Sequence, residues 1–336
     1  MRSRSVLVAF SGCLLLLAFG AAAASGNVEE IRIALDWTPN TNHSGIFVAM
    51  ALGFFADEGL ALEVLEPSET ASIPLVASGR SQFGVSMQEY VTMARAQDVS
   101  IVSIATLFQH NTSGFAAPSD RGITGPLDFE NLRYAGWGSD LESVMIRTVM
   151  EAVGADFDTV TMINMGMLDF TTAVRRDLAD FYWVFYGWQG IHADLQGIAF
   201  DFFPLPELAE VLDYYTPVIV TRERMIEDRP DVVRRFLRAL SRGYVYAALH
   251  PDEAAGILLA HAPELDAELV YASQAWIAGR TLADIDQWGR QEEVVWTRFA
   301  RWALDNGLIE RAIDPLAAFT NGFLPDGEDG SEEEGE

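Results

Sequence analysis

A regular alternation of short strand-like and helix-like segments between residues 31 and 221 constrains the fold more than any other feature. Residues 31–37 (IRIALDW) alternate as a strand does, and residues 46–52 then repeat apolar side chains with helical spacing. Further strands are predicted at 60–65, 82–86, 99–108, 133–136, 160–164, 181–186, 198–203 and 217–221. Further helices are predicted at 72–78, 88–96, 141–153 and 170–178. Such alternation predicts an α/β protein whose mostly parallel sheets are covered on both faces.

Two stretches divide this pattern into two lobes. Residues 111–120 are rich in Ser, Gly, Ala and Pro and are predicted to be a crossing, with a second crossing at 205–217. The strand at 217–221 is expected to return to the first sheet, and the chain from residue 230 onward is almost wholly helical. The predicted division gives lobe I residues 27–112 and 217–325, and lobe II residues 113–216. Two αβ lobes joined by two hinge crossings hold a ligand between them.

The composition excludes several functions. The 336 residues carry 49 acidic and 22 basic side chains, and the net charge of -27 argues against a nucleic-acid partner held through its phosphates. Every basic residue is arginine, so chemistry that needs a lysine is excluded. The five histidines are not paired at metal-ligand spacing and there is one cysteine, so neither a metal nor another cofactor is expected. Residues 326–336 hold seven acids among Gly and Ser and are predicted to be a disordered acidic tail.

The amino-terminal residues have the pattern of an export signal. Two arginines precede a mostly apolar run at 6–19, and alanines at 22–24 provide the small side chains that a signal peptidase needs. The run is shorter than the roughly 20 residues that span a bilayer. Residues 1–24 are therefore predicted to be a signal peptide, and the mature chain to be periplasmic or extracellular. A membrane anchor and a lipid attached to Cys13 are the alternatives.

Aromatic and amide residues gather after the predicted strands. In an open α/β sheet, ligands bind outside the carboxyl ends of the strands. The candidate ligand-binding residues are Trp37, Asn40, Asn42, His43, Gln88, Glu89, Tyr90, Trp137, Gly138, Ser139, Tyr186, Trp188, His192 and Tyr215. They suit a flat heteroaromatic ligand, because aromatic faces stack on its ring while amides and carboxylates bind its amines and ring nitrogens. Trp183 is expected to fill the core instead, and for Tyr214 and Tyr215 both interpretations stay open.

Five segments resemble the thiamine-pyrimidine-precursor binding proteins, the NMT/THI-like group of periplasmic solute receptors. The segments are LDWTPNTNHSGIFVAMALGFFADEGL (35–60), VSMQEYVTMARA (85–96), YAGWGSDLE (134–142), WVFYGWQGI (183–191) and LDYYTPVIVT (212–221). The resemblance spans about residues 30–325 and implies a type II periplasmic-binding-protein fold. It also implies an ABC permease and ATPase as partners, and a pyrimidine ligand such as formylaminopyrimidine or hydroxymethylpyrimidine. The resemblance implies that Trp37 stacks on the ring of the ligand. It also implies that the residues around the ligand are Asn42, Gln88, Glu89, Ser139 and Tyr186.

The chain departs from this family at His192. Relatives commonly read GIEA where residues 190–193 read GIHA, so an imidazole replaces a carboxylate that could accept from a pyrimidine amino group. The fungal pyrimidine-making enzymes of the superfamily carry a cysteine-rich run, with a lysine and a histidine on the helix after the third strand. Residues 86–90 (SMQEY) have neither, so the chain is expected to be a receptor and not an enzyme. The alternatives are a pyrimidine-processing enzyme with Glu89 or His43 as acid/base, and a receptor for another heteroaromatic or sulfonate solute.

Overall fold

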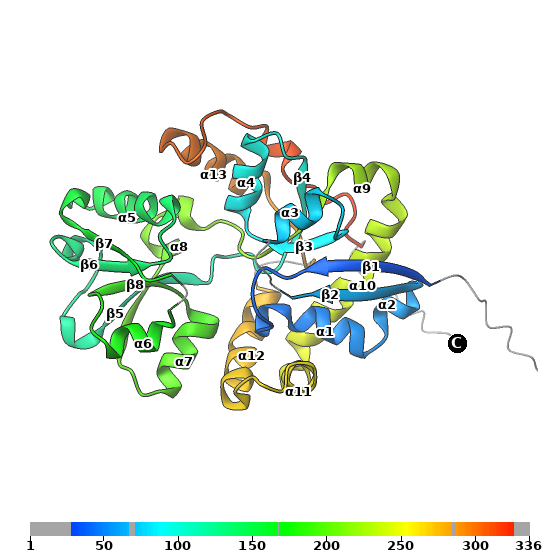
Figure 1. The fold of residues 1–336 in the computed structure, drawn as a ribbon, viewed down its shortest axis with the longest axis horizontal. Helices are drawn as coiled ribbons and strands as arrows, with labels where there is room; N and C mark the ends of the chain where they lie inside the picture. Colours follow the sequence, from blue (N-terminus) through cyan, green and yellow to red (C-terminus); the bar gives the residue numbers. More distant parts are fainter. Residues whose placement is uncertain (1–27, 67–70, 167, 284–286, 326–336) are drawn as a thin grey trace, which may run out of the picture.

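The computed structural model describes residues 28–66, 71–166, 168–283 and 287–325 and contains two five-stranded sheets (Figure 1). Lobe I is built on the sheet β2-β1-β3-β10-β4 and lobe II on the sheet β7-β6-β8-β5-β9. The strands of lobe I are β1 (Glu29–Ala34), β2 (Leu60–Leu65), β3 (Phe83–Ser86), β4 (Ile101–Thr106) and β10 (Val218–Arg222). Those of lobe II are β5 (Ser113–Pro118), β6 (Arg133–Gly136), β7 (Thr161–Asn164), β8 (Phe181–Phe185) and β9 (Phe200–Pro204).

Helices cover the sheets of both lobes (Figure 1). Lobe I carries α1 (Ser44–Ala51), α2 (Phe54–Asp57), α3 (Ser72–Ala77), α4 (Gln88–Ala96), α9 (Glu223–Asp228), α10 (Pro230–Leu249), α11 (Pro251–His261) and α12 (Ala267–Thr281). Lobe II carries α5 (Asp140–Ala152), α6 (Phe170–Arg175), α7 (Ile191–Leu195) and α8 (Leu205–Leu208). The last long helix, α13 (Glu293–Asp305), packs Trp302 into the core of lobe II and Trp296 beside β10 of lobe I, so it joins the two lobes.

Each sheet contains one strand that runs against the others. β1 is parallel to β2 and β3, whereas β10 is antiparallel to β3 and β4; likewise β6 is parallel to β7 and β8, whereas β5 is antiparallel to β8 and β9. The reversed strand is in both cases the first after a crossing. The carboxyl ends of the other four strands in each sheet therefore lie where the crossings leave each lobe, and they point toward the opposite lobe (Figure 1).

The segment at 111–120 was wrongly predicted to be only a crossing. Its residues Ser113–Pro118 form β5, a strand buried along its whole length between β8 and β9. A side chain on Gly114 would lie 2.5 Å from the carbonyl oxygen of Phe203 and equally close to the ring of Phe202. The small residues that are typical of a loop are thus needed here for close packing inside a sheet.

Several predictions fall on residues outside those described. The signal peptide (1–24), the lipid site at Cys13 and the acidic tail (326–336) lie outside the described residues and stay predictions. The boundaries of the two lobes also stay predictions. Among the described helices, none combines the length and the apolar character that crossing a membrane requires.

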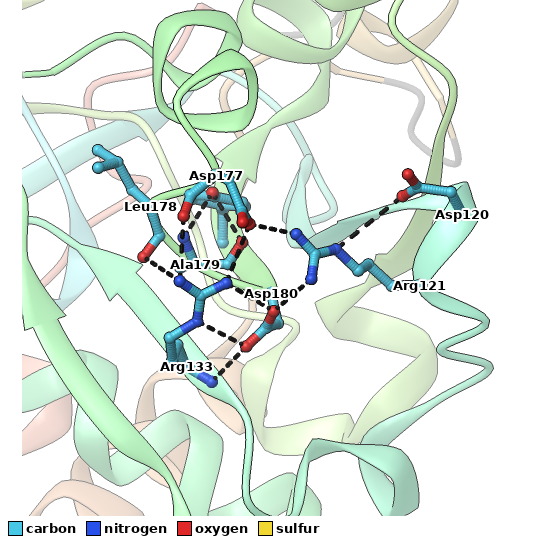
Figure 2. Close-up of polar contacts among 8 residues, drawn as sticks. Asp120, Arg121, Arg133, Asp177, Leu178, Ala179 and Asp180 are labelled. Carbon is cyan, nitrogen blue, oxygen red and sulfur yellow. Dashed lines mark hydrogen bonds and ion pairs between the residues drawn. The ribbon is translucent and has the colours of Figure 1, made fainter.

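Two arginines and two aspartates tie strands together at the edge of lobe II away from lobe I (Figure 2). Arg133, which begins β6, donates to Asp180 from Nε (3.0 Å) and Nη2 (2.9 Å), and Arg121 donates to the same carboxylate at 3.0 Å. Both arginines also contact Asp177. The bonds from Arg133 hold the pKa of Asp180 below its ordinary value of 3.8, although partial burial opposes this. The ionised Asp180 therefore stabilises the pairing of β6 with β8.

Asp180→Asn is expected to lower the free energy of unfolding by about 2 kcal/mol, because it removes a charge that accepts from two guanidinium groups. Urea unfolding followed by circular dichroism measures this. Asp120→Asn is the control: its side chain is 86% exposed and lies 4.0 Å from Arg121, so the change should stay below about 0.5 kcal/mol. Equal effects of the two variants would contradict a specific role for Asp180.

Acid should remove this difference. A carboxyl whose folded-state pKa is depressed contributes its full stability above its ordinary pKa and loses it as the pH falls through the folded value. The gap between wild type and Asp180→Asn is thus expected to be constant from pH 7 to about pH 5 and to shrink below about pH 4.

Candidate functional site

The loop after β1 presents Trp37 at the carboxyl edge of lobe I. Leu35 is buried, whereas Trp37 is 40% exposed. Among the described residues, no aromatic ring stacks against Trp37. The indole is therefore available to a planar ligand, as the predicted stacking role requires, although its contact with a ligand stays a prediction.

A buried histidine fixes this loop. His43 ends the short helix η1 (Thr41–His43); its Nδ1 accepts from the Asn40 backbone N–H (3.3 Å), so its Nε2 carries the hydrogen and donates to Asp36 (2.8 Å). The side chain of Asn40 accepts from the backbone of Asn42 at 2.9 Å. Both ring nitrogens of His43 are occupied in this conformation, so the side chain orients Asp36 and has no free nitrogen for a ligand.

Gln88, the first residue of α4, holds the second crossing in place. The side-chain Oε1 of Gln88 accepts from the backbone N–H of Tyr215 (2.8 Å), and the backbone N–H of Gln88 donates to the Tyr215 carbonyl (3.0 Å). Tyr215 is itself buried, and its hydroxyl accepts from the backbone N–H of Glu292 at 2.8 Å. Both side chains are buried and their polar groups form internal hydrogen bonds, so their ligand contacts stay predictions.

Glu89, the next residue of α4, is a buried carboxyl whose Oε2 has no hydrogen-bond partner. It is 1% exposed. Burial raises the pKa of Glu89 to about 8. A backbone hydrogen bond lowers this pKa, and the negative charge of Asp36 raises it further. The carboxyl is therefore neutral at pH 7 and offers one donor and one acceptor.

Tyr90 lies within electrostatic range of acidic groups from both lobes. Its ring is 48% exposed. Burial, followed by the negative charges of Glu89, Glu142 and Asp36, raises the pKa of the Tyr90 hydroxyl to about 12. Because Glu142 belongs to lobe II and the other two acids to lobe I, Tyr90 lies where the two edges approach each other.

On lobe II, the start of α5 is capped by residues that the sequence had marked. Glu142 accepts from the backbone N–H and the hydroxyl of Ser139, both at 2.8 Å, and from the Tyr134 hydroxyl at 2.8 Å. Gly138 has φ of +84°, a conformation that favours glycine. Trp137 packs edge-on against Trp183 at 5.0 Å. As expected, Trp183 lies in the core, whereas Trp137 is only half-buried.

The aromatic turn after β8 contacts lobe I as well as lobe II. In η5 (Tyr186–Gly190), Tyr186 donates to Asp194 (2.8 Å) and packs on Trp276 of α12 at 5.3 Å. Trp188 packs against the core of lobe I. His192 is half-buried, with Nδ1 3.6 Å from Asp169. Trp188 thus has an interlobe contact that the sequence did not predict.

Two site residues escaped the sequence analysis. Asp36 and Glu142 join Glu89 in making both facing edges acidic, and in the part of the chain described none of the three is paired with an arginine. The spacing Ser139-x-x-Glu142 is a capping-box signal that could have indicated Glu142. Asp36 lies two residues after the end of β1, but only the fold shows that His43 holds it.

Comparison with known proteins identifies the family. A family described as NMT1/THI5 like matches residues 40–254. The chain belongs to the NMT1/THI5-like family. It is 25% identical over 301 residues to a formylaminopyrimidine-binding protein of Halalkalibacterium halodurans, with 88% of this chain and 90% of the relative covered. It is 26% identical over 315 residues to a 4-amino-5-hydroxymethyl-2-methylpyrimidine phosphate synthase of Legionella pneumophila, with 90% and 95% covered.

Solved structures confirm the fold of this NMT1/THI5-like protein. The periplasmic aliphatic sulphonate binding protein SsuA from Escherichia coli matches with a TM-score of 0.70 at 15% identity, covering 86% of this chain and 97% of that chain. The predicted type II periplasmic-binding fold, with two αβ lobes joined by two crossings, is therefore confirmed. At this identity the likeness shows the fold alone.

The relatives overturn the expectation that the chain is not an enzyme. The Legionella relative bears a synthase name and matches at least as large a share of the chain as the binding protein does. The absence of the fungal-type cysteines and lysine therefore does not by itself support the expectation that this chain is a receptor and not an enzyme.

Gln88→Met is expected to lower the free energy of unfolding by about 1–3 kcal/mol, because it leaves the buried N–H of Tyr215 without an acceptor. Thermal and urea unfolding measure the loss. Gln97→Met, on the exposed end of the same helix, is the matched control and should change stability by less than about 0.5 kcal/mol. A Gln88→Met protein as stable as the control would show that Gln88 does not hold the second crossing.

Proposed function

We propose that this protein binds a thiamine pyrimidine precursor, of the formylaminopyrimidine or hydroxymethylpyrimidine type, between its lobes and delivers it to an ABC importer. The observation that carries the proposal is the buried carboxyl of Glu89, whose Oε2 lacks a partner at the edge that faces lobe II. An unsatisfied buried polar group costs about 1–3 kcal/mol, and a complementary ligand recovers that cost.

An aminopyrimidine has the edge that such a carboxyl binds. Its exocyclic amine donates, and the adjacent ring nitrogen accepts. A neutral carboxyl presents the opposite pair, since its O–H donates and its carbonyl oxygen accepts. Glu89 is neutral at pH 7 because burial raises its pKa to about 8. Trp37 supplies the exposed ring on which the pyrimidine stacks, an interaction that contributes about 0.5–1.5 kcal/mol beyond burial.

The charge of the site argues against an anionic solute such as a sulfonate. Helix N-termini attract anions. Here the first turn of α5 already carries Asp140 and Glu142, and that of α4 carries Glu89, which is neutral at pH 7 but still fills the place of an anion. A sulfonate would have to lie beside these carboxyls, so the likeness to a sulphonate binding protein does not extend to the chemistry of the ligand.

Export and transport complete the proposal. The signal-like residues 1–24 would direct the chain across the membrane, and an ABC permease with its ATPase would receive the ligand. The relative named formylaminopyrimidine-binding protein supports this role. Lobe I comprises residues 27–112 and 217–325 in this proposal, and lobe II residues 113–216.

A second candidate is chemical conversion of a pyrimidine at the same site. The observation that favours it is the similarity to a protein named as a pyrimidine phosphate synthase. Within this chain, the neutral Glu89 is the group that could exchange a proton with a bound ring, because both nitrogens of His43 are already occupied.

Calorimetric titration of the purified protein is expected to show one-site binding of hydroxymethylpyrimidine or formylaminopyrimidine and no binding of taurine. The matched 4-oxo analogue of hydroxymethylpyrimidine presents the wrong donor pattern to Glu89 and should bind at least tenfold more weakly. Binding of taurine without any pyrimidine would refute the proposed ligand class. Mass spectrometry of the same mixtures tests the second candidate, which requires consumption of the pyrimidine.

The pH dependence of affinity is expected to report on Glu89. Because its pKa is raised to about 8, the Glu89 carboxyl of the empty site already carries at pH 7 the proton that it donates to the ligand. At higher pH the carboxyl is ionised and must take up a proton from solvent before it can donate. The affinity for a neutral aminopyrimidine should therefore be flat from pH 7 to 7.5 and fall about tenfold per pH unit above about 8. Glu89→Gln keeps a donor and an acceptor without titrating, so its profile should stay flat. Identical profiles for the two proteins would remove Glu89 from ligand recognition.

A further inference from the structure

One serine connects the two lobes on the side of α12. Ser273 is fully buried in α12, which packs on α10 and α11 of lobe I. Its hydroxyl donates to the backbone carbonyl of Gly187, in η5 of lobe II. It is also 2.6 Å from the Thr41 hydroxyl of η1 in lobe I. Because the Ser273 hydrogen is used on Gly187, Thr41 is the donor in that second bond.

The surrounding packing has no room to spare. Trp276, one turn along α12, contacts the ring of Tyr186 at 5.3 Å, and the guanidinium of Arg280 covers its ring at 3.4 Å. A Cβ on Gly187 would lie 2.8 Å from the Trp276 ring and 3.2 Å from the side chain of Ile277. The Gly187 carbonyl can therefore approach Ser273 only because this position is a glycine.

The two partners of Ser273 lie next to the candidate ligand-binding residues of opposite lobes. Thr41 lies between Asn40 and Asn42, in the segment that follows Trp37. Gly187 lies between Tyr186 and Trp188. The chain of bonds from Thr41 through Ser273 to Gly187 thus links both sides of the site without itself supplying an exposed group.

We propose that Ser273 is a positioning residue whose bond to Gly187 holds the aromatic turn of lobe II against lobe I and so slows escape of the ligand. This inference rests on the proposed ligand site between the lobes. Separating the lobes breaks the Ser273–Gly187 bond, whereas the bond to Thr41 stays within lobe I. The hydroxyl therefore favours the arrangement in which Tyr186 packs on Trp276 of lobe I.

Two variants weaken this contact in independent ways. Ser273→Ala removes the hydroxyl, and Gly187→Ala keeps it but forces the turn away from Trp276. Thr281→Val is the matched control, since it removes another buried hydroxyl of α12 that bonds only to Ile277 of the same helix. Each protein is first checked by thermal unfolding, so that a loss of folding is recognised.

The dissociation rate of hydroxymethylpyrimidine, measured by stopped-flow tryptophan fluorescence, should rise about tenfold in Ser273→Ala and Gly187→Ala, with association rates within about twofold of wild type. Thr281→Val should match wild type. A folded Ser273→Ala protein with the wild-type dissociation rate would overturn the inference.

X-ray scattering of the ligand-free proteins separates this inference from the proposed ligand. The radius of gyration should increase in Ser273→Ala and Gly187→Ala and stay unchanged in Thr281→Val. If wild type binds no pyrimidine but this increase is seen, the proposed function fails and the interlobe contact stands. If wild type binds the pyrimidine and neither the rate nor the radius changes, the contact fails and the function stands.

Discussion

The short first crossing determines where a ligand can bind. Six residues separate the end of β4 at Thr106 from the start of β5 at Ser113, and such a segment spans at most about 20 Å. β5 must therefore begin at the edge of its sheet nearest lobe I, and it can do so only by running antiparallel to β8 and β9. After a longer crossing, β10 returns to lobe I and likewise runs antiparallel to its neighbours β3 and β4. As a result, the carboxyl edges of both sheets face each other, with the loops that follow their strands between them.

The electrostatics of this site come from competition between helix ends and burial. The N-terminus of α4 favours a negative charge at Glu89, but removal from water disfavours it more strongly, and the pKa of Glu89 rises to about 8. Glu142 accepts three hydrogen bonds at the start of α5. The carboxyl edge of lobe I thus offers the neutral Glu89, and that of lobe II offers Glu142, whose carboxyl group already accepts three hydrogen bonds. This pair underlies the proposal that the ligand donates and accepts along one edge and is not an anion.

Local patterns in the sequence predicted most of the fold, because periodicity and turn residues reflect local physics. The strands at 60–65 and 133–136 and the helix at 88–96 match the structure. β5 was missed because its small residues report on tertiary crowding around Gly114, which no local pattern encodes. The positions after strands drew attention to Trp37, which is exposed, and to Glu89, whose Oε2 has no hydrogen-bond partner, although their contact with a ligand stays a prediction. They could not show that His43 and Gln88 are consumed by internal hydrogen bonds, since their partners Asp36 and Tyr215 are chosen by the fold.

Receptors and synthases can share this architecture because lobe closure serves both. A receptor needs closure to slow release of its solute, and an enzyme needs it to exclude water from the reacting ring. In this chain the closure contacts and the chemical group are separate. Ser273 and Trp188 join the lobes at α12 and at the core of lobe I, whereas Glu89 lies at the start of α4 with an unused carboxyl oxygen. Because function depends on the site and not on the fold, residues at the strand ends can set binding or catalysis within one such architecture.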